Sequence, residues 1–229
     1  MNRCTDYISH YKADAEQFDY FHNSDTTDHA YEVLFREFIR RLAGKPAKVL
    51  DVGSGGGWTR ELPHDHIFFV DLSHKNLLTL KPGSSGAILA DACYLPFKTE
   101  SLNLVIASEI LEHLNSPETA ADEILRVLRK GGKAIVSTPY KEKLRYALCI
   151  HCNQVTPINA HLRSFDKEAL SSLFSNAKKK TYLFGSKILV LLRVPRLFYR
   201  LPFRMWRSID YLLIKFSDKA QHVIVVLEK

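Results

Sequence analysis

Short, nearly continuous apolar runs recur along the first two thirds of the chain. Their length and their β-branched residues predict buried strands. These runs cover residues 48–53, 66–72, 86–91, 102–108 and 133–138. Apolar residues at helical spacing predict helices at residues 30–42, 117–129 and 166–176. Continuous apolar strands that alternate with helices are typical of a parallel sheet with helices on both faces, so the pattern predicts a doubly wound α/β fold.

The last third of the chain departs from this rhythm. Residues 180–184 and 222–228 predict two further strands, and the apolar and basic stretch 186–216 between them predicts a helical insertion before the last strand. Pro195 and Pro202 should divide that insertion into short helices. We therefore expect a single domain. It would comprise a helical cover at 1–44, a core at 45–184, the basic apolar insertion at 185–217 and the last strand at 218–229.

Composition places the chain among globular proteins. Its 229 residues suffice for one α/β domain, and 46% of them are hydrophobic. The first twenty residues carry several acids and no continuous apolar stretch, so we expect no signal peptide. The cysteines do not form a disulfide pattern, which favours a reducing, cytoplasmic location.

A formal net charge of +7 points to an anionic partner, and most of the surplus lies in residues 186–216. The arginines there recur at helical spacing, which predicts one basic face beside apolar residues. They are Arg193, Arg196, Arg200, Arg204 and Arg207. Such a segment suits a peripheral helix on an anionic membrane surface, at the inner face of the membrane, without spanning it. A substrate lid with a solvated arginine face is an equal alternative. Nucleic acid is disfavoured because no recognised RNA-binding module is present.

A glycine-rich turn follows the first predicted strand, at residues 51–57 (Asp-Val-Gly-Ser-Gly-Gly-Gly). Glycines let the chain turn sharply and approach a ligand closely, although a tight turn also occurs without a ligand. Asp71 and Asp91 end the second and third strands, so three acids should meet at the carboxyl edge of the sheet. A carboxylate at Asp71 can accept hydrogen bonds from both ribose hydroxyls of a nucleoside. These features together favour a nucleoside-binding crevice.

Four ordered motifs resemble those of class I S-adenosylmethionine (SAM)-dependent methyltransferases of the type 11 kind. They are residues 49–57 (VLDVGSGGG), 91–97 (DACYLPF), 101–114 (SLNLVIASEILEHL) and 123–132 (EILRVLRKGG). The resemblance implies a Rossmann-like, mainly parallel seven-stranded sheet and SAM as the cofactor. A nicotinamide dehydrogenase fits less well, because Trp58 occupies the place of its third motif glycine.

The resemblance also implies which residues meet the cofactor. The glycine turn would pack against the methionine and ribose, the acids after the second and third strands would bind ribose and adenine, and the turn after the fourth strand would lie near the sulfonium. The expected cofactor-binding residues are Asp51, Gly53, Ser54, Gly55, Gly57, Asp71, Leu72, Asp91, Ala92, Ser108 and Glu109. Tyr11 and the aromatic residues of 18–21 are expected to close over the cofactor.

Methyl transfer from a sulfonium is an in-line displacement, so alignment of the acceptor is the enzyme's main task. His113 and His161 follow the fourth and fifth strands and are the expected catalytic residues. Either can act as a general base near neutral pH or can orient the acceptor. The expected acceptor is a small molecule, a lipid or a glycan. The alternative is a non-catalytic SAM-binding or membrane-associated interaction protein.

Cys149 and Cys152 have the spacing of a zinc knuckle, and His151 or His161 would be needed to complete the site. Because no second cysteine pair exists, we expect two reduced thiols and no bound metal. This segment, with the following Thr-Pro and His-Leu-Arg-Ser-Phe, also resembles a stretch in methyltransferases of glycan and lipid-carrier pathways.

Overall fold

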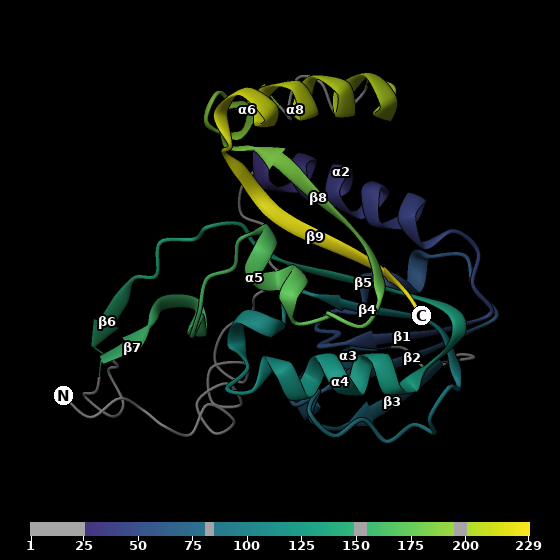
Figure 1. The fold of residues 1–229 in the computed structure, drawn as a ribbon. Helices are drawn as coiled ribbons and strands as arrows, with labels where there is room; N and C mark the ends of the chain where they lie inside the picture. The colour runs from purple at the N-terminus through teal and green to yellow at the C-terminus, as the bar shows by residue number, and fades with distance from the viewer. Residues whose placement is uncertain (1–25, 81–84, 149–154, 195–200) are drawn as a thin grey trace.

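The computed structural model describes residues 26–80, 85–148, 155–194 and 201–229. A seven-stranded sheet, in the order β3-β2-β1-β4-β5-β9-β8, forms the centre and carries helices on both faces (Figure 1). The predicted fold class, including a helical insertion before the last strand, is confirmed. The strands are β1 Lys48–Val52, β2 His66–Asp71, β3 Ser85–Leu89, β4 Leu102–Ser108, β5 Leu128–Pro139, β8 Lys178–Ser186 and β9 Ala220–Glu228.

Strand order creates a crevice. The strands β3, β2, β1, β4 and β5 are parallel, and the chain leaves β1 toward β2 and β3 before it returns to β4 on the other side of β1. In open α/β sheets, ligands bind at the carboxyl ends of the strands where the order reverses. The last strand β9 lies antiparallel between β5 and β8, and places His222 opposite Pro139. This pairing brings the C-terminal strand to the carboxyl end of β5.

Helices on the two faces of the sheet complete the core. They are α2 Thr26–Ala43, α3 His74–Thr79, α4 Pro117–Val127, α5 Lys167–Ser172, α6 Lys187–Leu191 and α8 Phe203–Ser217. Alternate residues of β1 point to opposite faces: Leu50 packs with Ile124 of α4, while Val49 packs with Trp206 of α8 and with α2. We did not predict α3, whose six residues are too few to show a helical period; Ser73 begins it by accepting the backbone N–H of Asn76.

The insertion differs from the predicted continuous arginine face. Helix α6 ends at Leu191, Arg193 adopts a left-handed backbone (φ 55°), and α8 begins after Pro202. Arg207 turns inward and forms an ion pair with the fully buried Asp210 at 2.7 Å. The prediction of a single basic face is therefore wrong for the described residues. The chain forms two separate helices, α6 and α8, and Arg207 pairs with a buried acid instead of facing solvent. Arg196 and Arg200 lie outside the described residues.

The outer face of α8 is apolar instead. Met205, Ile209, Leu212 and Phe216 are exposed and recur at helical spacing, and Phe216 is 86% exposed. Figure 1 shows α8 as the outermost layer above α2. Among the described helices, none combines the length and the apolar character that a membrane crossing requires.

A small hairpin, β6 Tyr146–Leu148 and β7 Val155–Pro157, stands beside the main sheet (Figure 1). We did not predict its strands, which have three residues each. Cys149, Cys152 and His151 lie between them, outside the described residues, as do Tyr11 and the aromatic residues of 18–21.

Candidate functional site

The glycine-rich turn is fixed against the neighbouring strand β2 and the segment after β4. The backbone N–H of Gly53 donates to the carbonyl of Val70 at 2.8 Å. Gly53 has a left-handed backbone (φ 69°), and a Cβ there would lie 2.6 Å from Cδ1 of Ile110. Only glycine fits such a close approach without strain. The turn therefore lies at the switch point between β1 and β4, as expected from the sequence.

Asp71 connects the end of β2 to this turn. Its carboxylate accepts the backbone N–H of Gly55 at 2.8 Å and that of Ser73 at 2.7 Å. The residue is only 2% exposed. Burial raises the pKa of Asp71, and these hydrogen bonds oppose the rise. The structure thus places Asp71 at the predicted position and shows that its oxygens also hold the turn.

Three other predicted contact residues lie outside the lining of the two cavities described below. Asp51 is buried beneath the turn, where the Thr59 hydroxyl donates to it at 2.5 Å, and burial raises its pKa to about 7. Gly57 faces inward, where a Cβ would lie 2.3 Å from Leu80. Asp91 accepts the backbone N–H of Cys93 at 2.9 Å. These three residues stabilise the turns that form the crevice, and they do not line the cavities themselves.

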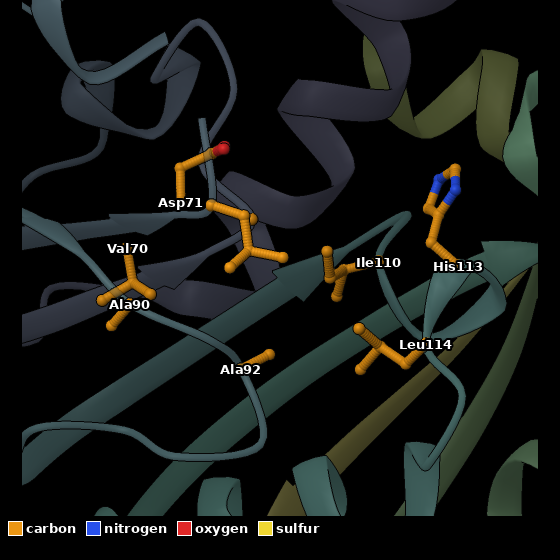
Figure 2. A pocket seen from close by; sticks show the side chains of 9 residues that line it. Val70, Asp71, Ala90, Ala92, Ile110, His113 and Leu114 are labelled. Carbon is orange, nitrogen blue, oxygen red and sulfur yellow. The ribbon is translucent and has the colours of Figure 1, made fainter. Parts of the chain in front are cut away.

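A narrow apolar slot opens at the ends of β1 and β2. Figure 2 shows Val70, Ala90 and Ala92 on one side of it, with Ile110 and Leu114 on the other. Its walls are mostly apolar side chains, which suit contact with an aromatic ring. The sequence analysis did not identify Ile110 and Leu114 as lining residues. Their spacing of four residues in the segment after β4 is the signal that could have placed them on the same side. The slot is lined by Gly53, Val70, Asp71, Leu72, Ala90, Ala92, Ile110, His113 and Leu114.

A larger cavity of about 730 Å³ adjoins the slot and shares Gly53 and His113 with it. Its walls come from α2, the glycine turn, the end of β4, the turn before His161 and the start of β9. Of the predicted residues, Gly53, Ser54, Gly55, Ser108, Glu109, His113 and His161 line it. The predicted cofactor and acceptor residues therefore line two spaces that share Gly53 and His113.

A hydrogen-bonded chain crosses one wall of this cavity. The Tyr31 hydroxyl lies 2.5 Å from Nδ1 of His222, whose Nε2 lies 3.2 Å from Glu109. Ser137 donates to Glu109 at 2.9 Å and lies 2.9 Å from the Ser108 hydroxyl. Burial alone would raise the pKa of Glu109, but His222 and the Ser137 hydroxyl hold it below its usual value. Glu109 is thus kept as a carboxylate.

The sequence did not indicate Tyr31, Ser137 or His222 as members of this chain. They come from α2, β5 and β9, which are far apart in sequence. No local motif marks them, and only the antiparallel insertion of β9 brings His222 to Glu109.

The two predicted histidines lie side by side in the lining of the cavity. The rings of His113 and His161 meet edge to face, with centroids 4.7 Å apart. Nδ1 of His113 lies 3.3 Å from the carbonyl of Ala160, and Nδ1 of His161 bonds to Glu142. Burial, followed by the charge of His161, lowers the pKa of His113 to about 4. His113 is therefore neutral near pH 7.

Two residues of the cavity lining have unusual backbone conformations. Glu109 and Ala160 both have φ of 55°, in the left-handed region that residues other than glycine rarely adopt. Such strain persists only where the surrounding structure holds it, and it is concentrated at functional sites. Its position agrees with a functional role for the turns that carry Glu109 and His161.

Comparisons with known proteins agree with this geometry. Residues 50–136 match the family described as methyltransferase domain. An uncharacterized protein of Methanocaldococcus jannaschii is 28% identical over 206 residues, which cover 87% of this chain and 88% of that protein. The malonyl-[acyl-carrier protein] O-methyltransferase of Methylococcus capsulatus is 32% identical over 110 residues, 44% of this chain but only 40% of that enzyme's length.

The fold also matches solved structures. Phosphoethanolamine N-methyltransferase 2 of Haemonchus contortus, solved in complex with SAM, superposes with a TM-score of 0.61 over 96% of this chain and 60% of that one. At 16% identity, this likeness concerns the fold alone. The matching domain, the ordered motifs and the sheet topology taken together show that the chain is similar to class I SAM-dependent methyltransferases and that residues 50–136 carry a methyltransferase domain.

Proposed function

We propose that the narrow slot binds the adenine ring of SAM and that the glycine turn binds its ribose and methionine. The apolar faces of Leu72, Ala92 and Ile110 support this position for adenine. Asp71 has lone pairs beyond those used by Gly55 and Ser73, and these would accept the ribose hydroxyls. Ser54, Gly55, Ser108 and Glu109 would meet the methionine end in the larger cavity. Asp51, Gly57 and Asp91 would act indirectly, through the shape of the turns.

We further propose that the larger cavity receives an acceptor of small-molecule or lipid type that is methylated on an oxygen atom. The observation that carries this proposal is that the cavity and the slot share Gly53 and His113, so a molecule in the cavity would lie beside the cofactor. Relatives that are named O-methyltransferases support oxygen as the acceptor atom. In this reaction the S–CH₃ bond of SAM breaks while an O–CH₃ bond forms, and the proton of the acceptor hydroxyl passes to a neutral imidazole of His113 or His161 or to water. The products are S-adenosylhomocysteine and the methyl ether or ester.

His113 and His161 are the proposed catalytic residues, because both line this cavity and His113 also lines the slot proposed for adenine. Their imidazole rings would hold the reacting oxygen in line with the methyl group. Alignment of this kind supplies most of the rate in a displacement on an already activated donor.

We propose that the apolar outer face of α8 rests on an anionic lipid surface. Such a position would support a lipid as the acceptor. Arg204 and Lys215 are exposed along one edge of that face, and the acid of this helix, Asp210, is buried. Apolar burial contributes about 25 cal/mol per Å², and nearby basic residues add attraction to anionic headgroups. Co-sedimentation with phosphatidylglycerol vesicles should decrease in Ile209→Asp but not in Leu148→Asp, which changes an exposed leucine of the hairpin. Equal binding by both variants would contradict the proposal.

The test of the proposed activity is turnover of SAM to S-adenosylhomocysteine with hydroxyl- and carboxyl-bearing acceptors of small-molecule, lipid and glycan type. His161→Ala should slow turnover by about a hundredfold while SAM affinity stays nearly unchanged, because His161 lines the acceptor end. Tight SAM binding without turnover on any acceptor would instead support the non-catalytic alternative.

A further inference from the structure

We propose that Glu112, His113 and His161 form a binding site for one divalent transition-metal ion at the acceptor end of the larger cavity. The three side chains can each offer a ligand atom, and these atoms lie within 4.8 Å of one another. Two of the residues line the cavity, and Glu112 lies directly behind them. The use of the ion in catalysis rests on the proposed function, but its binding does not.

Glu112 gives the first independent reason for an ion. The residue is 1% exposed, and neither carboxylate oxygen has a hydrogen-bond partner in any other described residue. A buried carboxylate without a partner is strongly unfavourable. A cation bound beside Glu112 would supply the missing partner.

The backbone holds the three residues together. Glu112 and His113 belong to the short 3₁₀ helix Leu111–His113, so they are adjacent in sequence. The backbone N–H of Leu162 donates to the carbonyl of Glu112 at 2.8 Å, which fixes His161 beside this helix. The edge-to-face contact of the two imidazole rings follows from this attachment. The cluster is therefore built by two segments that are bonded to each other.

Hydrogen bonds to the Nδ1 atoms resemble those around metal-bound histidines. A ligating histidine usually donates its second ring N–H to a carboxylate or a backbone carbonyl. His161 Nδ1 bonds to Glu142, and His113 Nδ1 faces the carbonyl of Ala160 at 3.3 Å. In this arrangement Nε2 is the ligand atom of each ring. Glu142 would be a positioning residue that orients His161.

Two imidazoles and one carboxylate suit zinc and its neighbours in the first transition series better than magnesium, which prefers oxygen ligands. Tetrahedral zinc at about 2.1 Å from its ligands separates them by about 3.4 Å, so the side chains would close slightly around the ion. Three protein ligands leave a position open for the acceptor oxygen. Coordination lowers the pKa of a bound hydroxyl; because a metal-bound imidazole cannot take up the proton, the proton would pass to water. The histidines would then act as ligands instead of general bases.

The experiment measures binding of zinc alone to metal-free protein by titration calorimetry. The Cys149→Ser/Cys152→Ser background removes the other pair of candidate ligands noted in the sequence. One zinc per chain is expected. Glu112→Gln and His161→Ala should each weaken binding at least tenfold, and Glu142→Gln about ten- to a hundredfold. Cobalt in place of zinc should give visible absorption bands that change in the same variants.

His66→Ala is the matched control, because His66 is an exposed histidine at the opposite, amino-terminal end of β2. It should bind zinc like the parent. Thermal unfolding of each variant shows whether the fold is retained, and Glu142→Gln tests the site if Glu112→Gln unfolds. No stoichiometric zinc binding, or equal binding by folded forms of all the cluster variants, would overturn the site. Neither result depends on SAM or on an acceptor, so the proposed activity would stand or fall separately.

Discussion

Asp71→Asn should separate the cofactor role of this residue from its structural role. The Asp71 oxygens face two different donors, the N–H groups of Gly55 and Ser73, so one of them would meet the new amide NH₂ in either orientation of Asn. A hydrogen bond to a charged group contributes about 1.5–3 kcal/mol. If that loss falls on the SAM complex, the dissociation constant should rise by about ten- to 150-fold.

Titration calorimetry with SAM and with S-adenosylhomocysteine measures this change, and urea unfolding of the same samples measures any loss of fold stability. Asp122→Asn is the matched control, since Asp122 is exposed on α4, away from the crevice. It should bind SAM like the parent. Cofactor affinity of Asp71→Asn within twofold of the parent would refute the assignment of Asp71 to the ribose.

Two further predictions concern stability. Asp210→Ala removes a fully buried carboxylate that accepts the N–H of Ser186 at 2.6 Å and pairs with Arg207, so urea unfolding should show a loss of about 3–5 kcal/mol; a loss below about 1 kcal/mol would contradict the buried pair. The pKa of Asp51 is about 7 in the folded protein and about 4 in the unfolded chain. Because the folded state favours the protonated form, the contribution of Asp51 to stability is complete below pH 4 and is lost as the pH rises toward 7. The parent should therefore lose up to about 4 kcal/mol relative to Asp51→Asn between pH 4 and pH 7, and a constant difference would show that Asp51 is already ionised in the folded protein.

Local features of the sequence determined much of the fold. Buried strands show as continuous apolar runs, and the predicted β1, β2 and β4 agree with the structure to within one or two residues at their ends. The glycine turn and Asp71 were also found, because a ligand-binding turn directly follows its strand and the next parallel strand ends beside it. These features depend on neighbours in sequence or on the rule that parallel strands share an edge.

The helical insertion shows where local reasoning ends. Helical spacing correctly indicated helices within 186–216, but it placed the arginines on one exposed face. Arg207 instead points inward because Asp210 is buried under it and needs a positive partner. Which face of an amphipathic helix is buried depends on the surface that the rest of the chain presents to it. In α8 the buried face is the one that carries Trp206, which packs in the core.

Tertiary structure alone decided which side chains from distant segments meet at the site. His222 reaches Glu109 only because β9 inserts antiparallel between β5 and β8, and His161 reaches Glu112 only through the backbone bond from Leu162. The sequence determined the individual elements, since their hydrogen bonds and apolar periods are local. It could not determine the contacts of His222 with Glu109 and of His161 with Glu112, because burial and pairing between distant segments are properties of the whole packed chain.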